Sequence, residues 1–404
     1  MQAQSHGQSP SGYWSCLMNL CATIASNVMN GRMGPHTVKR PLTVGVEEEF
    51  FVIDPSTRGL RGDTQTLLNS VQASCGNVSY SEELRPCMIE SRTGICQDLH
   101  QVRAEISGLR NGLIQAAEET GAWIAATGSF PLADWRTQGF VPKPRFAYVA
   151  KTYARLAAEH VICACHVHVG IKDREIAIQV LNRVRPWLPV LSALSSSSPF
   201  WMREDTGYAS YRSMVWERWP MAGMPPTFYS YDDYRQRVNL LVDTGISADA
   251  GQVFWDVRLG TRYETIEFRI ADSCTTVDET VVQAGLSRAL VQQCLDELER
   301  GEKFRDIRPE LLRAAKWHSA RFGLTGNLLD PISAKVLPGH TVVDQLFSYV
   351  RIPLQEASDW NEMTKIVERT KRLGSSAERQ RRVFSETNRL VDVADLLVRE
   401  TATI

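Results

Sequence analysis

Three consecutive glutamates, Glu47, Glu48 and Glu49, interrupt an apolar run that extends from Leu42 to Ile53. The valine, isoleucine and phenylalanine around them are typical of a strand, whereas glutamate is depleted from strands. Because side chains alternate across a strand, Glu47 and Glu49 share one face, about 6–7 Å apart, and Glu48 takes the other. Buried carboxylates are costly unless they are paired or bind a metal, so the pattern predicts that Glu47 and Glu49 flank a divalent cation.

The alternative interpretation of this segment is a solvated edge strand whose charges prevent aggregation. The apolar residues on both sides of the glutamates favour the cation site, because edge strands are seldom so apolar on both flanks.

The composition is that of an ordinary globular protein. The 404 residues can bury a large core, and their 43% hydrophobic and 23% charged content is unremarkable for that class. A net charge of −1 gives no general attraction to nucleic acid or to a membrane surface, so neither is expected as a partner. Nine cysteines, an odd number in a long chain, indicate reduced thiols and a cytoplasmic protein.

The first 39 residues differ from the rest of the chain. An uncharged stretch covers residues 13–29, but residues 1–31 contain no Lys or Arg that could form the basic region of a signal peptide. We therefore expect residues 1–39 to be a poorly ordered extension, with a short amphipathic helix as the alternative, and residues 40–404 to be a single domain.

Strand-like and helix-like segments follow one another without a regular βαβ rhythm, which favours an α+β fold over a doubly wound one. Apolar spacing predicts strands over 87–93, 122–130, 161–171 and one or two within 252–271. It predicts helices over 97–120, 173–195, 276–300, 308–322, 341–370 and 376–400, with loops over 131–146 and 196–230.

Several common catalytic motifs are absent from the sequence. It contains no GxxxxGK[ST], GxGxxG, HExxH or GxSxG segment. Any nucleotide chemistry must therefore use another scaffold.

Four sulfur and imidazole side chains lie within six residues, in the segment Cys163-Ala-Cys165-His166-Val-His168. Alternation along a strand points both cysteines one way and both histidines the other, so one ion cannot collect all four. Core cysteines and a pair of histidines lining a site fit this geometry better than a zinc site, and two hydrogen-bonded core histidines are the structural alternative.

A later strand places Glu267 and Arg269 on one polar face, while Ile266, Phe268 and Ile270 form the apolar face. The two polar residues are either an exposed ion pair or a metal ligand beside an arginine that neutralises phosphate. Arg203, Arg212 and Arg218 lie in a segment rich in tyrosine, tryptophan and serine, and bind an anionic ligand or lie on a solvated helix.

Taken together, these segments resemble the bacterial carboxylate–amine ligases of the glutamate–cysteine ligase type 2 group. The resemblance rests on GVEEEF (45–50), CACHVHVG (163–170), SPFW (198–201), DTGYASYRSM (205–214), WDVR (255–258), TIEFRIAD (265–272) and ERQRR (378–382). These segments occur in the order typical of the group and span residues 40–400, which the resemblance makes a single ligase domain. Leu259-Gly260 departs from it, because proline is common after the arginine in the group.

The resemblance implies a glutamine-synthetase-like fold, in which a curved, mainly antiparallel sheet carries helices on its outer face. It implies an ATP-dependent carbon–nitrogen ligase that uses Mg²⁺, with glutamate and cysteine, or another amine, as small-molecule substrates. Glu47, Glu49, Glu90 and Glu267 match metal-binding carboxylates, Arg269 a phosphate-contacting arginine, and His166 and His168 the site-facing strand. Arg203, Arg212 and Arg218 are candidates for substrate or phosphate binding.

In the reaction so implied, ATP phosphorylates a carboxylate and an amine attacks the resulting acyl phosphate. The sequence does not name the amine, and the resemblance alone suggests a homodimer. A phosphotransferase of the same fold and a MgATP-binding relative without turnover are the other classes left open.

Overall fold

The computed structural model describes residues 42–75 and 79–403. The predicted extension over residues 1–39 lies outside these residues and stays a prediction. Among the described residues, no helix is both long and apolar enough to cross a membrane.

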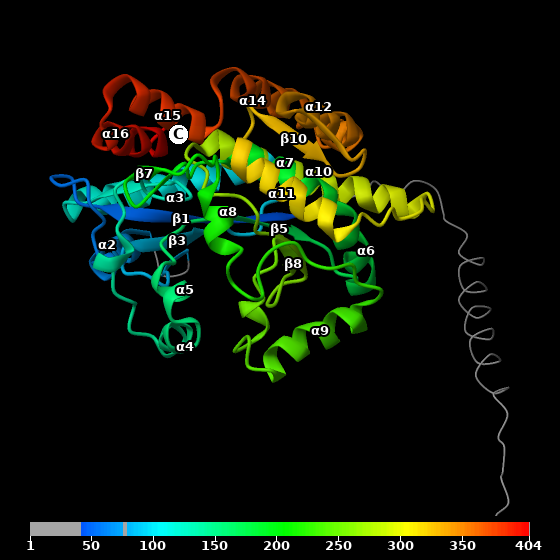
Figure 1. Ribbon diagram of the computed structural model, residues 1–404, viewed down its shortest axis with the longest axis horizontal. Helices are drawn as coiled ribbons and strands as arrows, with labels where there is room; N and C mark the ends of the chain where they lie inside the picture. Colours follow the sequence, from blue (N-terminus) through cyan, green and yellow to red (C-terminus); the bar gives the residue numbers. More distant parts are fainter. Residues whose placement is uncertain (1–41, 76–78, 404) are drawn as a thin grey trace, which may run out of the picture. The chain divides into compact units, whose positions relative to one another are not determined.

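An antiparallel sheet of seven strands forms the centre of the described chain (Figure 1). Its strands run in the order β2-β3-β1-β5-β9-β8, and β4 also pairs with β1. Their bounds are β1 (Val44–Ile53), β2 (Tyr80–Glu82), β3 (Met88–Arg92), β4 (Trp123–Ala125), β5 (Cys165–Gly170), β8 (Val257–Leu259) and β9 (Thr265–Phe268). Two small hairpins lie apart from it: β6 (Phe200–Trp201) with β7 (Glu204–Asp205), and β10 (Asn327–Asp330) with β11 (Lys335–Pro338).

The glutamate-bearing strand β1 is central, because β3 pairs with one of its edges and β5 with the other. The edge-strand interpretation of this segment is therefore wrong. The register opposes Glu47 to His166, and Glu49 to Glu90. Cross-strand partners in an antiparallel pair share a face, so these polar residues gather on one side of the sheet.

The α-helices of the described residues surround this sheet. Their bounds are α2 (Thr64–Cys75), α3 (Leu99–Glu119), α4 (Pro144–Tyr153), α5 (Arg155–Ala158), α6 (Arg174–Val184), α7 (Leu188–Ser195), α8 (Tyr211–Trp216), α9 (Tyr231–Asp243), α10 (Val277–Glu299), α11 (Pro309–Phe322), α12 (Gly339–Tyr349), α13 (Arg351–Glu356), α14 (Trp360–Leu373), α15 (Ser376–Thr387) and α16 (Leu390–Thr401). Single 3₁₀ turns are η1 (Trp135–Thr137), η2 (Arg185–Trp187) and η3 (Ala250–Gln252).

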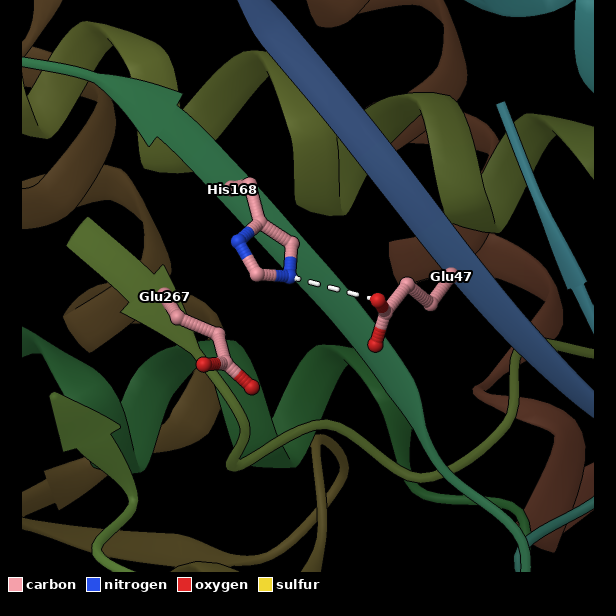
Figure 2. Close-up of side chains that lie close together, drawn as sticks. All are labelled: Glu47, His168 and Glu267. Carbon is pink, nitrogen blue, oxygen red and sulfur yellow. Dashed lines mark ion pairs between the residues drawn. The ribbon is translucent and has the colours of Figure 1, made fainter. Parts of the chain in front are cut away.

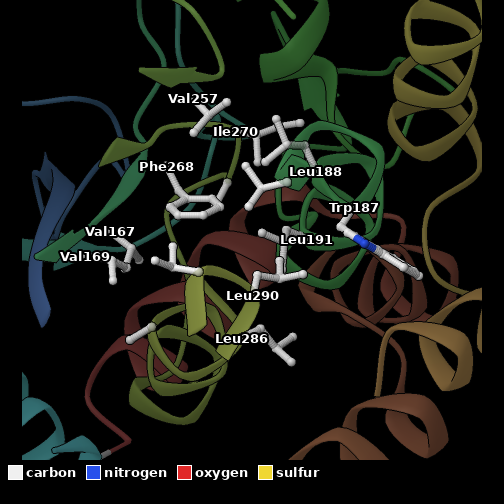
Figure 3. Packing of buried hydrophobic residues seen from close by; sticks show 14 of the residues in the cluster. Val167, Val169, Trp187, Leu188, Leu191, Val257, Phe268, Ile270, Leu286 and Leu290 are labelled. Atoms are coloured by element: carbon white, nitrogen blue, oxygen red, sulfur yellow. The ribbon is translucent and has the colours of Figure 1, made fainter. Parts of the chain in front are cut away.

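The apolar face of the sheet packs against helices. Figure 3 shows Val167 and Val169 of β5 and Phe268 of β9 close to Leu286 and Leu290 of α10. In Figure 1, α10, α7 and α3 lie on one side of the sheet, and α4, α5 and α9 lie on the other. The polar face is the one turned away from α10.

Helix α10 begins immediately behind the sheet and is fixed there by a capping box. The hydroxyl of Thr276 accepts from the backbone N–H of Glu279 at 3.3 Å, and the Glu279 carboxylate accepts from the Thr276 N–H at 3.0 Å. The reciprocal bonds satisfy two of the free backbone donors at the start of a helix, so the chain turns sharply from the last strand into α10.

The α+β class is confirmed, and the structure corrects several helix boundaries. Residues 173–195 form α6, η2 and α7 rather than one helix, because Pro186 and Pro189 interrupt the backbone hydrogen bonding. Residues 376–400 divide at Asn388, which adopts a left-handed conformation with φ of 53°. Residues 341–370 fall in α12, α13 and α14, and α2 and α4 lie in segments without a predicted helix.

Candidate active site

The polar face of the sheet collects charged side chains from three adjacent strands. Glu47 and Glu49 come from β1, His166 and His168 from β5, and Glu267 from β9. Arg269 follows β9 directly and lies on the same face as Glu267. The alternation read from the sequence therefore brings these predicted residues together.

One group on this face consists of Glu47, His168 and Glu267, whose ligand atoms all lie within 4.8 Å of one another. Figure 2 shows the imidazole of His168 between the two carboxylates, with Nε2 directed at Glu47. That nitrogen lies 3.6 Å from Oε1 of Glu47, and the other ring nitrogen lies 3.1 Å from Oγ1 of Thr265. Of the two histidines, His168 is therefore the one grouped with two carboxylates.

His166 occupies a neighbouring position in different electrostatic surroundings. Its Nδ1 lies 3.1 Å from Oε2 of Glu47, and its Nε2 has no hydrogen-bond partner within the described chain. Burial and the nearby Arg269 lower the pKa of His166 to about 4, so this imidazole is neutral. Burial also acts on His168, but Glu47 and Glu267 outweigh it and raise the pKa of that ring.

The first group is already compensated by cations. Arg258 binds Glu267 through two nitrogens, at 2.8 and 3.1 Å, and Arg269 also donates to the Glu267 carboxylate. Burial would raise the pKa of Glu267, but Arg258 and Arg269 hold it far below its usual range. Likewise, burial of Glu47 is outweighed by His166 and His168, so the pKa of Glu47 lies well below its usual value.

A second group consists of Glu49, Glu83 and Glu90, again with ligand atoms within 4.8 Å of one another. Burial and the Glu90 charge raise the pKa of Glu49 to about 8. Burial and the Glu49 charge raise the pKa of Glu83 to about 7, and burial and Glu83 raise that of Glu90. Three carboxylates here face one another with too little positive charge to offset their repulsion.

Few hydrogen bonds support the second group. Glu49 accepts from the backbone N–H of Ala164 at 2.7 Å, and Glu90 from the hydroxyl of Ser81 at 3.1 Å. Arg92 lies 3.5 Å from Glu90 and is more than a third exposed. The donor set is entirely carboxylate oxygen, which fits Mg²⁺ in chemistry and supplies negative charge that a divalent cation would offset.

Sequence reasoning missed Glu83 and Arg258. Glu83 follows the short strand β2 in a polar segment, Ser-Glu-Glu, that carries no apolar alternation, so only its proximity to Glu49 and Glu90 identifies it. Arg258 lies in the quoted WDVR segment, and its pairing with Glu267 depends on the register between β8 and β9. No local signal distinguishes either residue.

Glu48 lies on the opposite face of β1, as predicted, and is neutralised there. Arg110 of α3 binds both of its carboxylate oxygens, at 2.7 and 3.1 Å, and the hydroxyl of Thr280 donates at 2.5 Å. Arg110 also donates to the carbonyls of Cys274 and Thr275. Glu48 of β1 is thus bonded to Arg110 of α3 and to Thr280 of α10, and its charge is offset without a ligand.

The three arginines named from the sequence lie in different surroundings. Arg212 is buried, donates to the carbonyls of Arg269 and Ile270 at 3.1 and 3.2 Å, and so supports the end of the site strand. Arg218 pairs with Glu159 and is 38% exposed, and Arg203 lies exposed in the turn between β6 and β7. Of the three, Arg212 is hydrogen-bonded to the backbone of Arg269 and Ile270, and substrate binding by all three stays a prediction.

Cys163 and Cys165 are both buried in the core, as predicted, but they do not share one face of a strand. Strand β5 begins at Cys165, and Cys163 precedes it where the regular alternation does not hold. Cys165 packs with Val167 on the helical side, whereas Cys163 packs with Phe51 and Phe130 in a separate cluster. The described chain has no metal-ligating group of His, Cys, Asp or Glu that includes either cysteine.

Comparison with protein families gives one match over most of the chain. The model described as "Glutamate-cysteine ligase family 2 (GCS2)" matches residues 43–394. A protein of Frankia casuarinae named "Putative glutamate--cysteine ligase 2-2" is 40% identical over 362 residues, which cover 90% of this chain and 42% of that protein. A protein of Rhodopirellula baltica named "Putative glutamate--cysteine ligase 2" is 38% identical over 84% of this chain and 92% of its own length.

The relatives differ in length. This chain spans 42% of two of the Frankia relatives and 97% of another Frankia relative that is 37% identical.

Solved structures share the fold at low sequence identity. A glutamate–cysteine ligase of Francisella tularensis in complex with AMP has a TM-score of 0.67 and 11% identity, with 91% of this chain and 90% of that chain covered. A bifunctional glutathione synthetase of Pasteurella multocida has a TM-score of 0.64 and 12% identity, with 90% and 52% covered. These structures establish the expected ligase fold.

Proposed function

The chain belongs to glutamate-cysteine ligase family 2, and from this premise we propose that it is an ATP-dependent carboxylate–amine ligase. Glutamate and cysteine are the proposed substrates, as the names of the relatives indicate. The observation that carries the proposal is the gathering of two carboxylate groups and Arg269 on one face of a central sheet. Such a face can bind a polyphosphate together with its cations.

In this proposal each of the two groups binds one cation. Glu49, Glu83 and Glu90 would hold one Mg²⁺, since the arginines nearby do not offset their mutual repulsion. Glu47, His168 and Glu267 would hold another ion at a site that Arg258 orients. Bound Mg²⁺ would neutralise the phosphate oxygens of ATP and align the γ-phosphoryl group for transfer.

The chemistry proceeds in two displacements. An oxygen of the substrate carboxylate attacks the γ-phosphorus, the bond to the β–γ bridging oxygen breaks, and ADP leaves. The amine then attacks the carbonyl carbon of the acyl phosphate, loses a proton, and expels phosphate to leave an amide. Negative charge accumulates on phosphate oxygens in the first displacement.

We assign the stabilisation of that charge to Arg269. One of its terminal nitrogens donates to Glu267, and its Nε has no hydrogen-bond partner within the described chain. A guanidinium held on one side by a carboxylate can present its remaining N–H groups to phosphate. Arg212 keeps Arg269 in place by donating to its carbonyl.

The test is phosphate release from MgATP with glutamate present, across a panel of amines that includes cysteine, with products identified by mass. A cysteine-dependent signal and a γ-glutamylcysteine mass would establish glutamate–cysteine ligase activity. Turnover with another amine or carboxylate would keep the mechanism and change the substrate. ADP formation without an amide product would instead identify a phosphotransferase.

A non-catalytic relative would behave differently. MgATP would bind, and no pair of substrates would release phosphate. Where turnover is found, Arg269→Lys tests the role of this arginine, because the variant retains a positive charge but loses the planar fork that contacts phosphate bidentately. A turnover enzyme would lose most of its rate in this variant and keep its fold, as checked by circular dichroism.

A further inference from the structure

A cavity of about 420 Å³ lies on the helical side of the sheet, at the end of α10 that is remote from the carboxylates. It is lined by η2, by the last turn of α10 with the segment that follows, and by α12. Helix α10 has 23 residues and begins behind the polar face, so its length of about 35 Å separates the cavity from the proposed ligase site. The volume lies in the range of small-molecule pockets.

One wall of the cavity is aromatic. The rings of Trp187 and Tyr349 are stacked, with centroids 4.7 Å apart and planes at 24°. Figure 3 places Trp187 at the edge of the labelled core side chains, with its ring system extending away from Leu290. Phe304 adds a third ring to the lining. Flat aromatic surfaces of this kind favour a planar apolar ligand.

Polar groups that no protein atom engages line the same cavity. Within the described chain, the indole N–H of Trp187, a buried residue, and the side-chain amide of Gln345, a half-buried one, form no hydrogen bond with the protein. By contrast, the Tyr349 hydroxyl is used, since it donates to Glu297 at 2.7 Å. Pockets that bind small molecules combine such an apolar surface with a few unused polar groups.

The lining carries three carboxylates and three cations: Glu297, Glu302 and Asp330, and Arg183, Lys303 and Arg305. Glu297 faces Arg183 at 3.7 Å in addition to Tyr349, and Glu302 pairs with Arg300 at 2.7 Å. Asp330 accepts from the backbone of its own turn at 2.9 Å. Each carboxylate of the lining therefore has a partner.

Two cations at the rim of the cavity, by contrast, have no carboxylate partner among the described residues. Lys303 and Arg305 line the cavity, are exposed, and form no ion pair within residues 42–75 and 79–403. Two unpaired positive charges beside an aromatic wall select an anion over a cation of the same shape.

From this juxtaposition we propose that the cavity is a second ligand site, which takes a small planar aromatic anion. The ring lies against Trp187 and Phe304, and the anionic group, a carboxylate or a phosphate, is bound by Lys303 and Arg305. Binding here does not depend on the proposed ligase activity, so it can be measured whether or not the protein turns over ATP.

The experiment is a calorimetric titration of the full chain at about 0.15 M salt, where long-range attraction is screened beyond roughly 8 Å. The probes are indole-3-acetate, phenyl phosphate and, as a neutral match to the first, indole-3-acetamide. We expect saturable binding of at least one anion and weaker binding of the amide. The two anions differ in both ring and anionic group, so the preference between them ranks the two combinations.

Charge reversal at the rim locates the site. The variant Lys303→Glu/Arg305→Glu should weaken binding of the anion by about tenfold or more, because contact charges act at short range in salt. Arg308→Glu/Arg313→Glu is the matched control, with the same change in net charge at exposed residues outside the lining. Both pairs are on the surface, so a thermal melt should show an unchanged fold.

A second variant tests the aromatic wall independently. Phe304→Ala removes one ring without touching the charges and should weaken both the anion and the amide. Absence of saturable binding by all three probes would overturn the proposal. Equal weakening by the rim and control pairs would overturn it too, since the anion would then respond only to net charge.

Discussion

The two carboxylate groups on the polar face are neighbours with opposite electrostatics. Glu47 and Glu267 are held charged, because His168, Arg258 and Arg269 surround them and lower their pKa values. Glu49, Glu83 and Glu90 have raised pKa values, because burial and mutual repulsion are not offset. Glutamates on one face of the sheet thus differ in pKa, because the neighbouring strands supply enough positive charge to offset one group and too little to offset the other.

This difference in electrostatics indicates which of the two groups depends on a bound cation. In the first group the protein supplies its own positive charge, and a metal would share the site with arginine. In the second group the charged state is unfavourable until a cation arrives. Loss of a glutamate should therefore have opposite consequences for stability in the two groups.

The largest expected effect is on activity. Glu49→Ala should lower acceptor-dependent phosphate release from MgATP by about a thousandfold or more, because it removes a carboxylate from the proposed cation site. Glu118→Ala on the exposed surface of α3 is the control and should retain full activity. Near-normal turnover of a folded Glu49→Ala protein would remove Glu49 from the site.

The next effect is on stability of the compensated group. Glu267→Gln should lower the free energy of unfolding by about 3–5 kcal/mol, because Arg258 and Arg269 would be left as buried unpaired charges. Urea denaturation measures the change, and Glu264→Gln, an exposed neighbour, provides the control. A loss below about 1 kcal/mol would mean that water or other groups solvate the arginines.

The group of Glu49, Glu83 and Glu90 should make the stability of the metal-free protein depend on pH. Burial and the neighbouring carboxylates raise the pKa of Glu49 to about 8 and that of Glu83 to about 7, above the value of about 4.5 that both have in the unfolded chain. Between these values the folded protein binds more protons than the unfolded chain, so metal-free stability should fall as pH rises from about 5 to 8. Melting temperatures across this pH range, with and without Mg²⁺, measure this dependence of stability on pH.

Magnesium should restore the lost stability most strongly at the alkaline end, where the carboxylates are charged. Glu83→Gln should flatten the pH dependence, since it removes one titrating group and eases repulsion on Glu49. A metal-free melting temperature that rises over this pH range would contradict the assigned electrostatics.

The smallest expected effect concerns Arg218. Because its pair with Glu159 is partly exposed, Arg218→Ala should cost no more than about 1 kcal/mol of stability. The Michaelis constants for ATP and the carboxylate substrate decide whether it also binds a ligand. A marked rise in either constant would support the role predicted from the sequence, and no change would leave Arg218 as a surface ion pair.

Much of the site was predictable because it follows from local alternation. The period of a strand separates Glu47 and Glu49 from Glu48, and the same rule places His166 and His168 together. Long apolar periods likewise marked α3 and α10 to within two residues at each end. These features need only the sequence within one element.

Other features depended on partners far along the chain. Glu83 joins Glu49 through the turn between β2 and β3, and Arg258 meets Glu267 through strand pairing. Helix ends at Pro186 and Asn388 also differed from the periodic pattern, because backbone geometry overrode a continuous apolar spacing.

By itself, the sequence determined the class of fold, the family and the face on which each glutamate of β1 lies. The tertiary structure decided which of those glutamates are neutralised, since Arg110 reaches Glu48 from α3 and Arg258 reaches Glu267 from β8. The physical reason is that alternation is set by bonds between adjacent residues, whereas the charge state of a buried carboxylate depends on every cation and carboxylate that folding brings within a few ångströms.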